Sequence, residues 1–168
     1  MSWTWSNISP RRRRALWAIL VLIILTLAFI WGNSLLSRET SQQASSFVEA
    51  YIRPVLHALL GFLLAPSAID AINIRKLAHF FEFFVLGVEI TCLWYLLQPV
   101  RKVSVLWPIF LPLLVAGVDE SLQIVSSRGP SLFDVGIDWL GALTGVFITM
   151  LLRTLLLRCN AHRRENNA

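Results

Sequence analysis

The stretch that decides the fold is residues 75–97, which read RKLAHFFEFFVLGVEITCLWYLL. Its apolar part, residues 77–97, can cross a hydrocarbon core of about 30 Å as a helix, because a helix rises about 1.5 Å per residue. The first turns of the whole stretch 75–97 nevertheless carry Lys76, His79 and Glu82. Ionisable side chains are costly inside lipid, so their presence here predicts a site at this end of the helix.

The composition of the whole chain is typical of a membrane protein. Of 168 residues, 56% are hydrophobic and 15% are charged, whereas soluble domains carry about 25% charged residues. We therefore expect an integral membrane protein with one domain over residues 1–168. The net charge of +5 does not indicate a nucleic-acid partner. The arginines flank apolar runs, where they set topology and contact anionic membrane lipid.

Four apolar runs are long enough to span a bilayer. They cover approximately residues 15–36, 77–97, 103–125 and 135–157. The predicted fold class is all-α, a bundle of four transmembrane helices. Ten of the 15 Lys and Arg residues lie on the side of the N-terminus if the spans alternate in direction. The positive-inside rule therefore predicts a multi-pass protein with both termini in the cytoplasm.

The segment between the first two spans is polar on one face. Its polar side chains recur at helical spacing opposite apolar ones: Ser46, Glu49, Arg53 and His57. This pattern predicts an amphipathic helix. Pro54 is expected to break or kink that helix, and the apolar run that follows is too short to span. We expect residues 43–65 to form an amphipathic or re-entrant segment at the outer surface, and the pattern leaves open whether it lies on, enters or spans the membrane.

Further charges lie at the end of the third span, where residues 117–123 read GVDESLQ. Asp119 and Glu120 are adjacent carboxylates, and Gln123 lies one turn further on. A purely structural helix end requires one capping group and not two carboxylates. This turn is therefore a candidate part of the site.

The fourth span begins with the last charged group. Asp134 follows Ser131 at capping-box spacing, so part of its role is expected to be helix initiation, whereas Asp138 lies one turn deeper. The short connection 126–130 makes the third and fourth spans antiparallel neighbours. Arg128 in this connection is expected to reach Glu120 or Asp134. With the predicted threading, all three charged groups meet at the extracytoplasmic end of the bundle.

Two further features lie deeper in the spans. Glu89 near the middle of the second span is either a proton carrier or a protonated group that is hydrogen-bonded to Thr26 or Thr144, and the sequence does not separate these alternatives. Gly141 and Gly145 form a G-x-x-x-G face that lets a neighbouring helix approach closely, which predicts packing rather than chemistry.

The ordered motifs resemble those of the VanZ-like family. They are RKLAHFFEFFVLG (75–87), DESLQ (119–123) and NSLLSRETSQQAS (33–45), together with Arg128, Asp134, Asp138, Gly141 and Gly145. The resemblance covers approximately residues 16–152. It implies a small protein of the bacterial cytoplasmic membrane with a role at the cell envelope. The member that gives the family its name is associated with resistance to teicoplanin, which targets cell-wall precursors. The resemblance implies no particular reaction.

The first functional hypothesis is an outward-facing polar pocket that binds or modifies a lipid-linked or anionic envelope molecule. The expected acid and base groups are His79, Glu82, Glu120 and Asp134. The expected substrate-binding groups are Arg75, Lys76, Gln123, Arg128 and Asp138. The pocket contains carboxylates in several environments, which is the condition that separates acid from base roles. No nucleophile motif or phosphate-binding loop accompanies them, so enzymatic activity is left open.

Two other hypotheses come from different classes. In the second, the protein is an accessory or structural subunit whose buried charges only fix helix packing. In the third, carboxylates from several helices and one histidine bind a divalent metal. A single imidazole among carboxylates argues against that third hypothesis. We therefore assign no metal ligand and no cofactor from the sequence.

Overall fold

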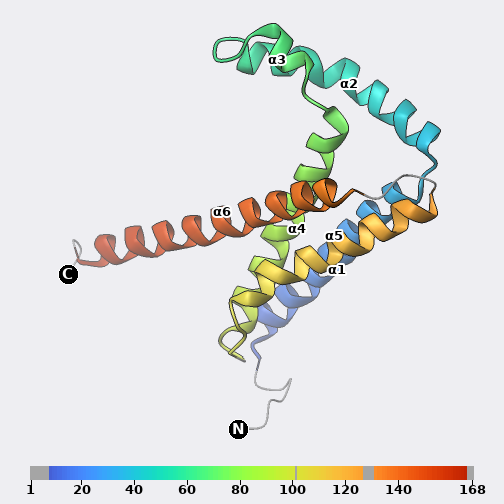
Figure 1. Cartoon of the computed structure of the whole chain (residues 1–168). Helices are drawn as coiled ribbons and strands as arrows, with labels where there is room; N and C mark the ends of the chain where they lie inside the picture. Colours follow the sequence, from blue (N-terminus) through green and yellow to red (C-terminus); the bar gives the residue numbers. More distant parts are fainter. Residues whose placement is uncertain (1–7, 101, 127–130, 166–168) are drawn as a thin grey trace.

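The computed structural model describes residues 8–100, 102–126 and 131–165. The described residues form six helices and no strand (Figure 1). The helices are α1 (Pro10–Leu35), α2 (Arg38–Leu60), α3 (Pro66–Asp70), α4 (Ile74–Leu97), α5 (Leu106–Val125) and α6 (Leu132–Glu165). α1, α4, α5 and α6 are each long and apolar enough to cross a membrane. The predicted all-α bundle of four spans is therefore confirmed.

Three of the spanning helices, α1, α4 and α6, are longer than the apolar runs that predicted them. α1 begins at Pro10 because the Ser9 side chain accepts a hydrogen bond from the Arg12 backbone N–H and proline suits the first helical position. α6 continues to Glu165, beyond the predicted end near residue 157. Apolar runs mark the length that needs lipid, whereas a helix ends only where capping or backbone geometry stops it.

α4 lies at the centre of the bundle and contacts α1, α5 and α6. Its closest neighbour is α6, because glycines replace side chains where the two helices cross. A Cβ added at Gly141 would lie 2.2 Å from the Phe80 carbonyl oxygen, and one added at Gly145 would lie 2.3 Å from that of Phe84. The G-x-x-x-G face therefore packs against α4. The buried apolar core around this crossing consists of Ile30, Phe83, Leu86, Ile90, Ala116 and Ala142.

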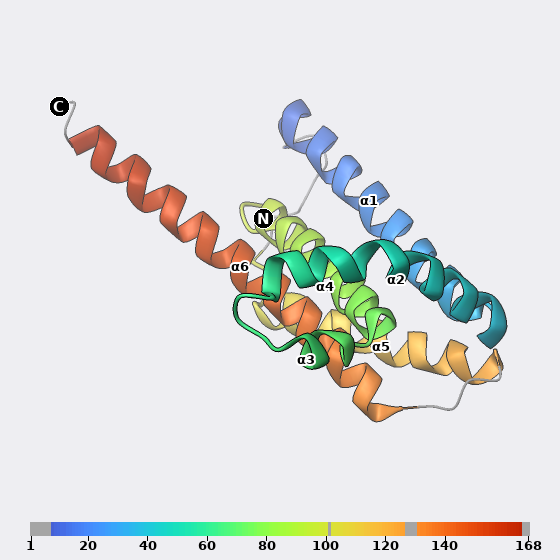
Figure 2. The same ribbon diagram turned by 90° about the horizontal axis from the view of Figure 1, so that it is seen from above.

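α2 and α3 form an arm at the end of the bundle where α4 begins (Figure 1). Seen from above, α2 passes across the bundle between the end of α1 and the start of α4 (Figure 2). The expected amphipathic helix is present. Pro54 was expected to break or kink it, and the helix does not break there. Pro54 is exposed and α2 continues through it to Leu60.

Contacts on both sides of Pro54 hold α2 to α3. Arg53 Nη1 donates hydrogen bonds to the backbone oxygens of Ile69 at 3.0 Å and Asp70 at 2.9 Å. His57 Nε2 lies 2.8 Å from Asp70 Oδ1. A proline inside a helix costs about 3 kcal/mol through the lost backbone hydrogen bond and the steric clash. These contacts with α3 help to offset that cost. They join residues far apart in the chain, so the periodicity of the sequence does not reveal them.

Candidate functional site

Four helix ends meet on one side of the bundle: the ends of α1 and α5 and the beginnings of α4 and α6. Each is joined to another by a polar contact between side chains. These contacts are Asn33 to Glu82 at 3.2 Å, Ser34 to Asp119 at 2.6 Å, Arg75 to Gln123 at 3.3 Å and Lys76 to Asp134 at 2.8 Å. The three charged motifs of the sequence therefore come together at one end of the bundle.

Capping residues set the register of the two helices that begin here. The Asn73 side chain accepts a hydrogen bond from the Lys76 backbone N–H at 3.2 Å, which starts α4 at Ile74. The Ser131 hydroxyl accepts one from the Asp134 backbone N–H at 3.3 Å. Lys76 and Asp134 consequently both lie in first turns, where they face each other across the start of α4 and α6.

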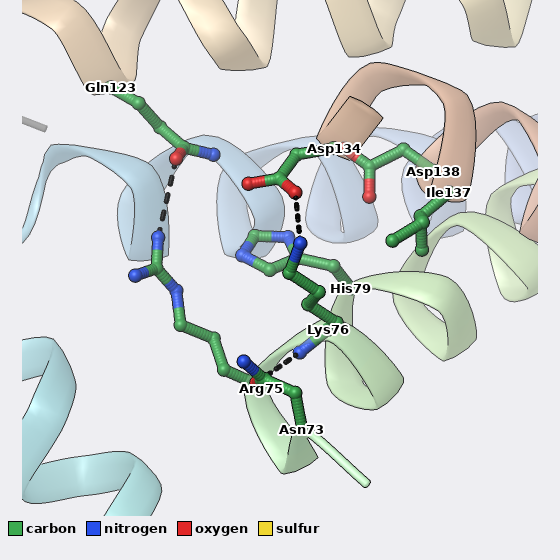
Figure 3. Close-up of a pocket in the computed structure, with 8 residues that line it drawn as sticks. All are labelled: Asn73, Arg75, Lys76, His79, Gln123, Asp134, Ile137 and Asp138. Carbon is green, nitrogen blue, oxygen red and sulfur yellow. Dashed lines mark hydrogen bonds and ion pairs between the residues drawn. The ribbon is translucent and has the colours of Figure 1, made fainter. Parts of the chain in front are cut away.

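A polar cavity of about 70 Å³ lies between these turns (Figure 3). We call it the polar cavity, and it is lined by Asn73, Arg75, Lys76, His79, Gln123, Asp134, Ile137 and Asp138. Six of the residues predicted for the site are among them. In Figure 3, Lys76 and Arg75 extend from α4 toward Asp134 and Gln123 on the facing helices. The volume corresponds to roughly two water molecules, which suits one small polar or ionic group.

A second, larger pocket adjoins the polar cavity on the side of α1 and α2. We call it the side pocket, and its volume is about 250 Å³. It is lined by Phe29, Asn33, Leu36, Ser41, Ser45, Val48, Ile74, Arg75, Ala78, His79 and Glu82. Arg75 and His79 line both spaces. A polar chamber and a largely apolar one therefore lie next to each other, with Arg75 and His79 between them.

Three helices each contribute one side chain to a cluster of potential metal ligands in the site. Ligand atoms of His79, Asp119 and Asp138 all lie within 4.8 Å of one another. Asp119 is fully buried and accepts hydrogen bonds from Ser34 at 2.6 Å and from the Gln123 side chain at 3.0 Å. Asp138 is 3% exposed, and among the described residues it accepts no hydrogen bond.

Glu82 and Glu120 lie outside the polar cavity. Glu82 lines the side pocket, where Oε1 accepts a hydrogen bond from Asn33 and Oε2 lies 3.6 Å from His79 Nδ1. Glu120 lines neither space, and its Oε1 accepts a hydrogen bond from the Ser131 backbone N–H. Glu120 Oε2 is buried and has no hydrogen-bond partner in the described part of the chain.

The predicted contacts of Arg128 lie outside the described residues. Its expected pairing with Glu120 or Asp134 therefore stays a prediction. The roles assigned to the other predicted site residues also stay predictions, because proximity alone does not distinguish a binding group from a packing group.

The sequence assigned no individual role to three residues that build this site. Asp119 lies in the turn that was predicted to be part of the site, and Asn33 and Ser34 at the end of α1 belong to the polar motif 33–45, but no contact was predicted for any of them. The available signal was the polar stretch that follows the first span. It indicates that α1 also ends in a polar environment, but it does not say which helix these side chains contact.

Glu89 has a defined partner deeper in the bundle. The Thr26 hydroxyl on α1 donates a hydrogen bond to Glu89 Oε1 at 3.0 Å, and Glu89 is 7% exposed. The other proposed partner, Thr144, instead donates to the Leu140 backbone oxygen on its own helix at 2.8 Å. Of the two hydrogen-bond partners predicted for Glu89, Thr26 is therefore confirmed.

Comparisons with known proteins agree with this architecture. The model of the VanZ/LLP1 family matches residues 16–153, which include most of each spanning helix. No curated protein and no solved structure matches the chain. With the family match covering most of its length and four apolar helices of spanning length, this chain is a membrane protein that belongs to the VanZ/LLP1 family.

Proposed function

We propose that this protein binds an anionic, lipid-linked molecule of the bacterial cell envelope at the outer end of its bundle. The observation that carries the proposal is the adjacency of the two spaces, which share Arg75 and His79 as lining residues. A molecule with an anionic head and an apolar chain would fit such a pair of spaces. The head would occupy the polar cavity and the beginning of the chain would occupy the side pocket.

The positive charges of the polar cavity support an anionic head. Arg75 donates to the neutral amide oxygen of Gln123, and among the described residues it forms no ion pair. Its charge is therefore available to a ligand. Lys76 pairs with Asp134, and its side chain is 40% exposed, so it can reach an added anion without leaving the cavity. Hydrogen bonds between such cations and an anionic oxygen are stronger than neutral ones.

The walls of the side pocket support an apolar chain. Phe29, Leu36 and Val48 contribute apolar side chains from α1 and α2. Phe29 is 60% exposed on a helix of spanning length, so this wall continues onto the surface that lipid would cover. A chain could therefore enter sideways from the bilayer, without passing through water.

We place the protein in the bacterial cytoplasmic membrane with both termini inside. This orientation rests on the distribution of Lys and Arg along the sequence. It puts the polar cavity at the extracytoplasmic surface, where lipid-linked cell-wall precursors are present. A role in resistance to glycopeptides such as teicoplanin is compatible with binding such a precursor.

The binding proposal is tested with the purified protein in detergent micelles and a fluorescent phosphate-headed lipid, with phosphatidylcholine of the same chain length as the neutral control. We expect Arg75→Gln and Lys76→Gln each to weaken binding of the phosphate lipid by about tenfold, since a charge-assisted hydrogen bond contributes about 1.5–3 kcal/mol. Arg158→Gln is the matched control, because Arg158 is an exposed arginine near the other end of α6. Equal loss with Arg158→Gln, or equal affinity for the neutral lipid, would contradict the proposal.

A packing role is the second candidate, and specific contacts favour it. Asn33 to Glu82 and Ser34 to Asp119 each join α1 to another helix. Interhelical hydrogen bonds in membranes stabilise bundles by about 0.6 kcal/mol on average. If packing is the whole role, Arg75→Gln and Lys76→Gln would leave lipid binding unchanged, and the effects of site substitutions would follow protein abundance.

A further inference from the structure

We propose that His79, Asp119 and Asp138 bind a divalent transition-metal ion of the zinc type at the inner end of the polar cavity. The three side chains come from α4, α5 and α6, so the ion would join three spanning helices. The sequence alone argued against a metal because it showed one imidazole among many carboxylates. The fold selects one imidazole and two carboxylates from that set and places them together.

The geometry of the three side chains fits a metal ion. Their ligand atoms lie within 4.8 Å of one another. Zinc bonds to nitrogen and oxygen are about 2.0–2.2 Å long and usually tetrahedral, so two ligand atoms on one ion are about 3.4 Å apart. Side-chain movements of up to about 1.5 Å would bring the three ligand atoms to this separation.

The environment of Asp138 is an independent reason to expect a cation. Asp138 is 3% exposed, lines the polar cavity and accepts no hydrogen bond among the described residues. A buried carboxylate without a donor or a cation is strongly unfavourable. The two nearest cationic side chains of the cavity, Arg75 and Lys76, contact Gln123 and Asp134 instead. A divalent ion would balance the charges of Asp119 and Asp138 together.

Asp119 is held as a metal ligand usually is. Ser34 and Gln123 donate to its two oxygens at 2.6 and 3.0 Å and fix the orientation of the carboxylate. Groups that hydrogen-bond to metal ligands in this way orient them and raise metal affinity. The lone pairs that these two donors leave unused remain available to an ion.

The donor set indicates the class of metal. Calcium and magnesium prefer oxygen ligands alone, whereas an imidazole suits zinc and its neighbours in the first transition series. Three protein ligands leave at least one coordination position for water or a ligand oxygen. His79 and Asp138 line the polar cavity and Asp119 does not, so an ion held by all three would have its open position on the cavity side.

The experiment uses the full chain in detergent micelles, without added lipid. The protein is treated with a chelator, dialysed and titrated with Zn²⁺, and the bound metal is measured by calorimetry and by elemental analysis. We expect one Zn²⁺ per chain. Asp138→Asn and His79→Gln should each weaken Zn²⁺ binding by about 100-fold or more. Loss of a group that only hydrogen-bonds to a metal ligand already lowers metal affinity by about 10- to 100-fold, and these two residues are proposed to be ligands themselves.

The matched control is His57→Gln. His57 lies 2.8 Å from Asp70 on the exposed arm, so it is an alternative place for a histidine and a carboxylate to hold zinc. We expect His57→Gln to bind Zn²⁺ like the natural chain. Loss of binding in this variant would move the metal to the arm and overturn the proposal.

Thermal unfolding separates metal binding from misfolding. Zn²⁺ should raise the Tm of the natural chain and leave that of Asp138→Asn unchanged. Metal-free Asp138→Asn should melt no lower than the metal-free natural chain, because the amide removes an uncompensated buried charge. Absence of Zn²⁺ binding by the natural chain, or equal binding by Asp138→Asn, would reject the metal site. Because no lipid is present, neither result depends on the proposed lipid binding.

Discussion

Glu120 is a buried carboxylate with an incomplete set of partners. Its Oε1 accepts a hydrogen bond from Ser131, while its buried Oε2 has no hydrogen-bond partner in the described part of the chain. Leaving such an oxygen unpaired costs about 1–3 kcal/mol. Either the group is protonated and serves packing, or its charge is used. Substitution by the nearly isosteric amide separates these roles, because it removes the charge and keeps the shape.

We expect Glu120→Gln and His79→Gln to insert and accumulate normally and to abolish the envelope phenotype that the proposed function predicts. The measurement is paired: protein level in isolated membranes, and teicoplanin susceptibility of a bacterial strain whose own copy has been deleted and replaced by each variant. A full phenotype with both variants at normal abundance would leave the packing role as the better explanation.

Thr26 and Thr144 are two threonines that the sequence could not rank. Thr26 donates across the bundle to Glu89, whereas Thr144 donates to the Leu140 backbone oxygen on its own helix. We expect Thr26→Val to lower the free energy of unfolding by about 0.5–1.5 kcal/mol, the range of interhelical hydrogen bonds in membranes. Thr144→Val should change it by less than about 0.5 kcal/mol, and Thr26→Ser should recover most of the loss.

Thermal unfolding in detergent measures this difference between the two threonines. Equal effects of Thr26→Val and Thr144→Val would show that the contact with Glu89 contributes nothing measurable to stability.

At the scale of elements, the crossing of α4 and α6 depends on the absence of side-chain atoms. Backbone oxygens of Phe80 and Phe84 occupy the space where Cβ atoms of Gly141 and Gly145 would be. Close approach of this kind increases van der Waals contact, which drives helix association in lipid. The same crossing brings the start of α6 to the start of α4, so it also positions Asp134 and Asp138 at the polar cavity.

We predict that Gly141→Ala lowers the free energy of unfolding by about 1–3 kcal/mol, the usual cost of overpacking. The added Cβ would lie 2.2 Å from the Phe80 oxygen, so the helices must separate. Gly136 on the same helix has nothing within 4 Å of an added Cβ. Gly136→Ala should therefore be neutral or stabilising, because alanine favours a helix by about 1 kcal/mol over glycine.

Equilibrium unfolding of the two glycine variants, in matched detergent, tests the helix crossing directly. If Gly141→Ala were as stable as Gly136→Ala, the close crossing of α4 and α6 would be wrong.

At the scale of the whole molecule, the direction in which the chain threads the membrane decides what the site can meet. The ends of α1 and α5 and the starts of α4 and α6 share one side, so the site lies on that side only. The distribution of basic residues favours the outside for this end.

The expected orientation can be measured by cysteine labelling of whole cells with an impermeant thiol reagent. Cysteines introduced as Thr40→Cys or Gly129→Cys, with Cys92 and Cys159 replaced by serine, should react. Cys159 in a Cys92→Ser chain should react only after the cells are opened. Labelling of Cys159 in intact cells would reverse the topology and put the polar cavity in the cytoplasm.

The sequence by itself determined the class of protein and its four spans, and it predicted that the charged motifs gather at one end of the bundle. These properties depend on local quantities: the length of apolar runs, the rise of a helix and the spacing of charges along it. The amphipathic character of α2 followed from the same local periodicity. The continuation of α2 through Pro54 did not follow from that periodicity. Contacts between α2 and α3 help to offset the cost of a proline inside the helix, and these contacts are not local in the sequence.

Only the tertiary structure decided which polar groups face one another. Asp119 and Glu120 are neighbours in sequence and about 100° apart around α5, so their spacing does not say which one faces the bundle. Packing turns Asp119 toward His79 and Asp138 and leaves Glu120 beside Ser131. The rotation of each helix is set by contacts with the other helices, and those contacts involve residues far apart in the chain.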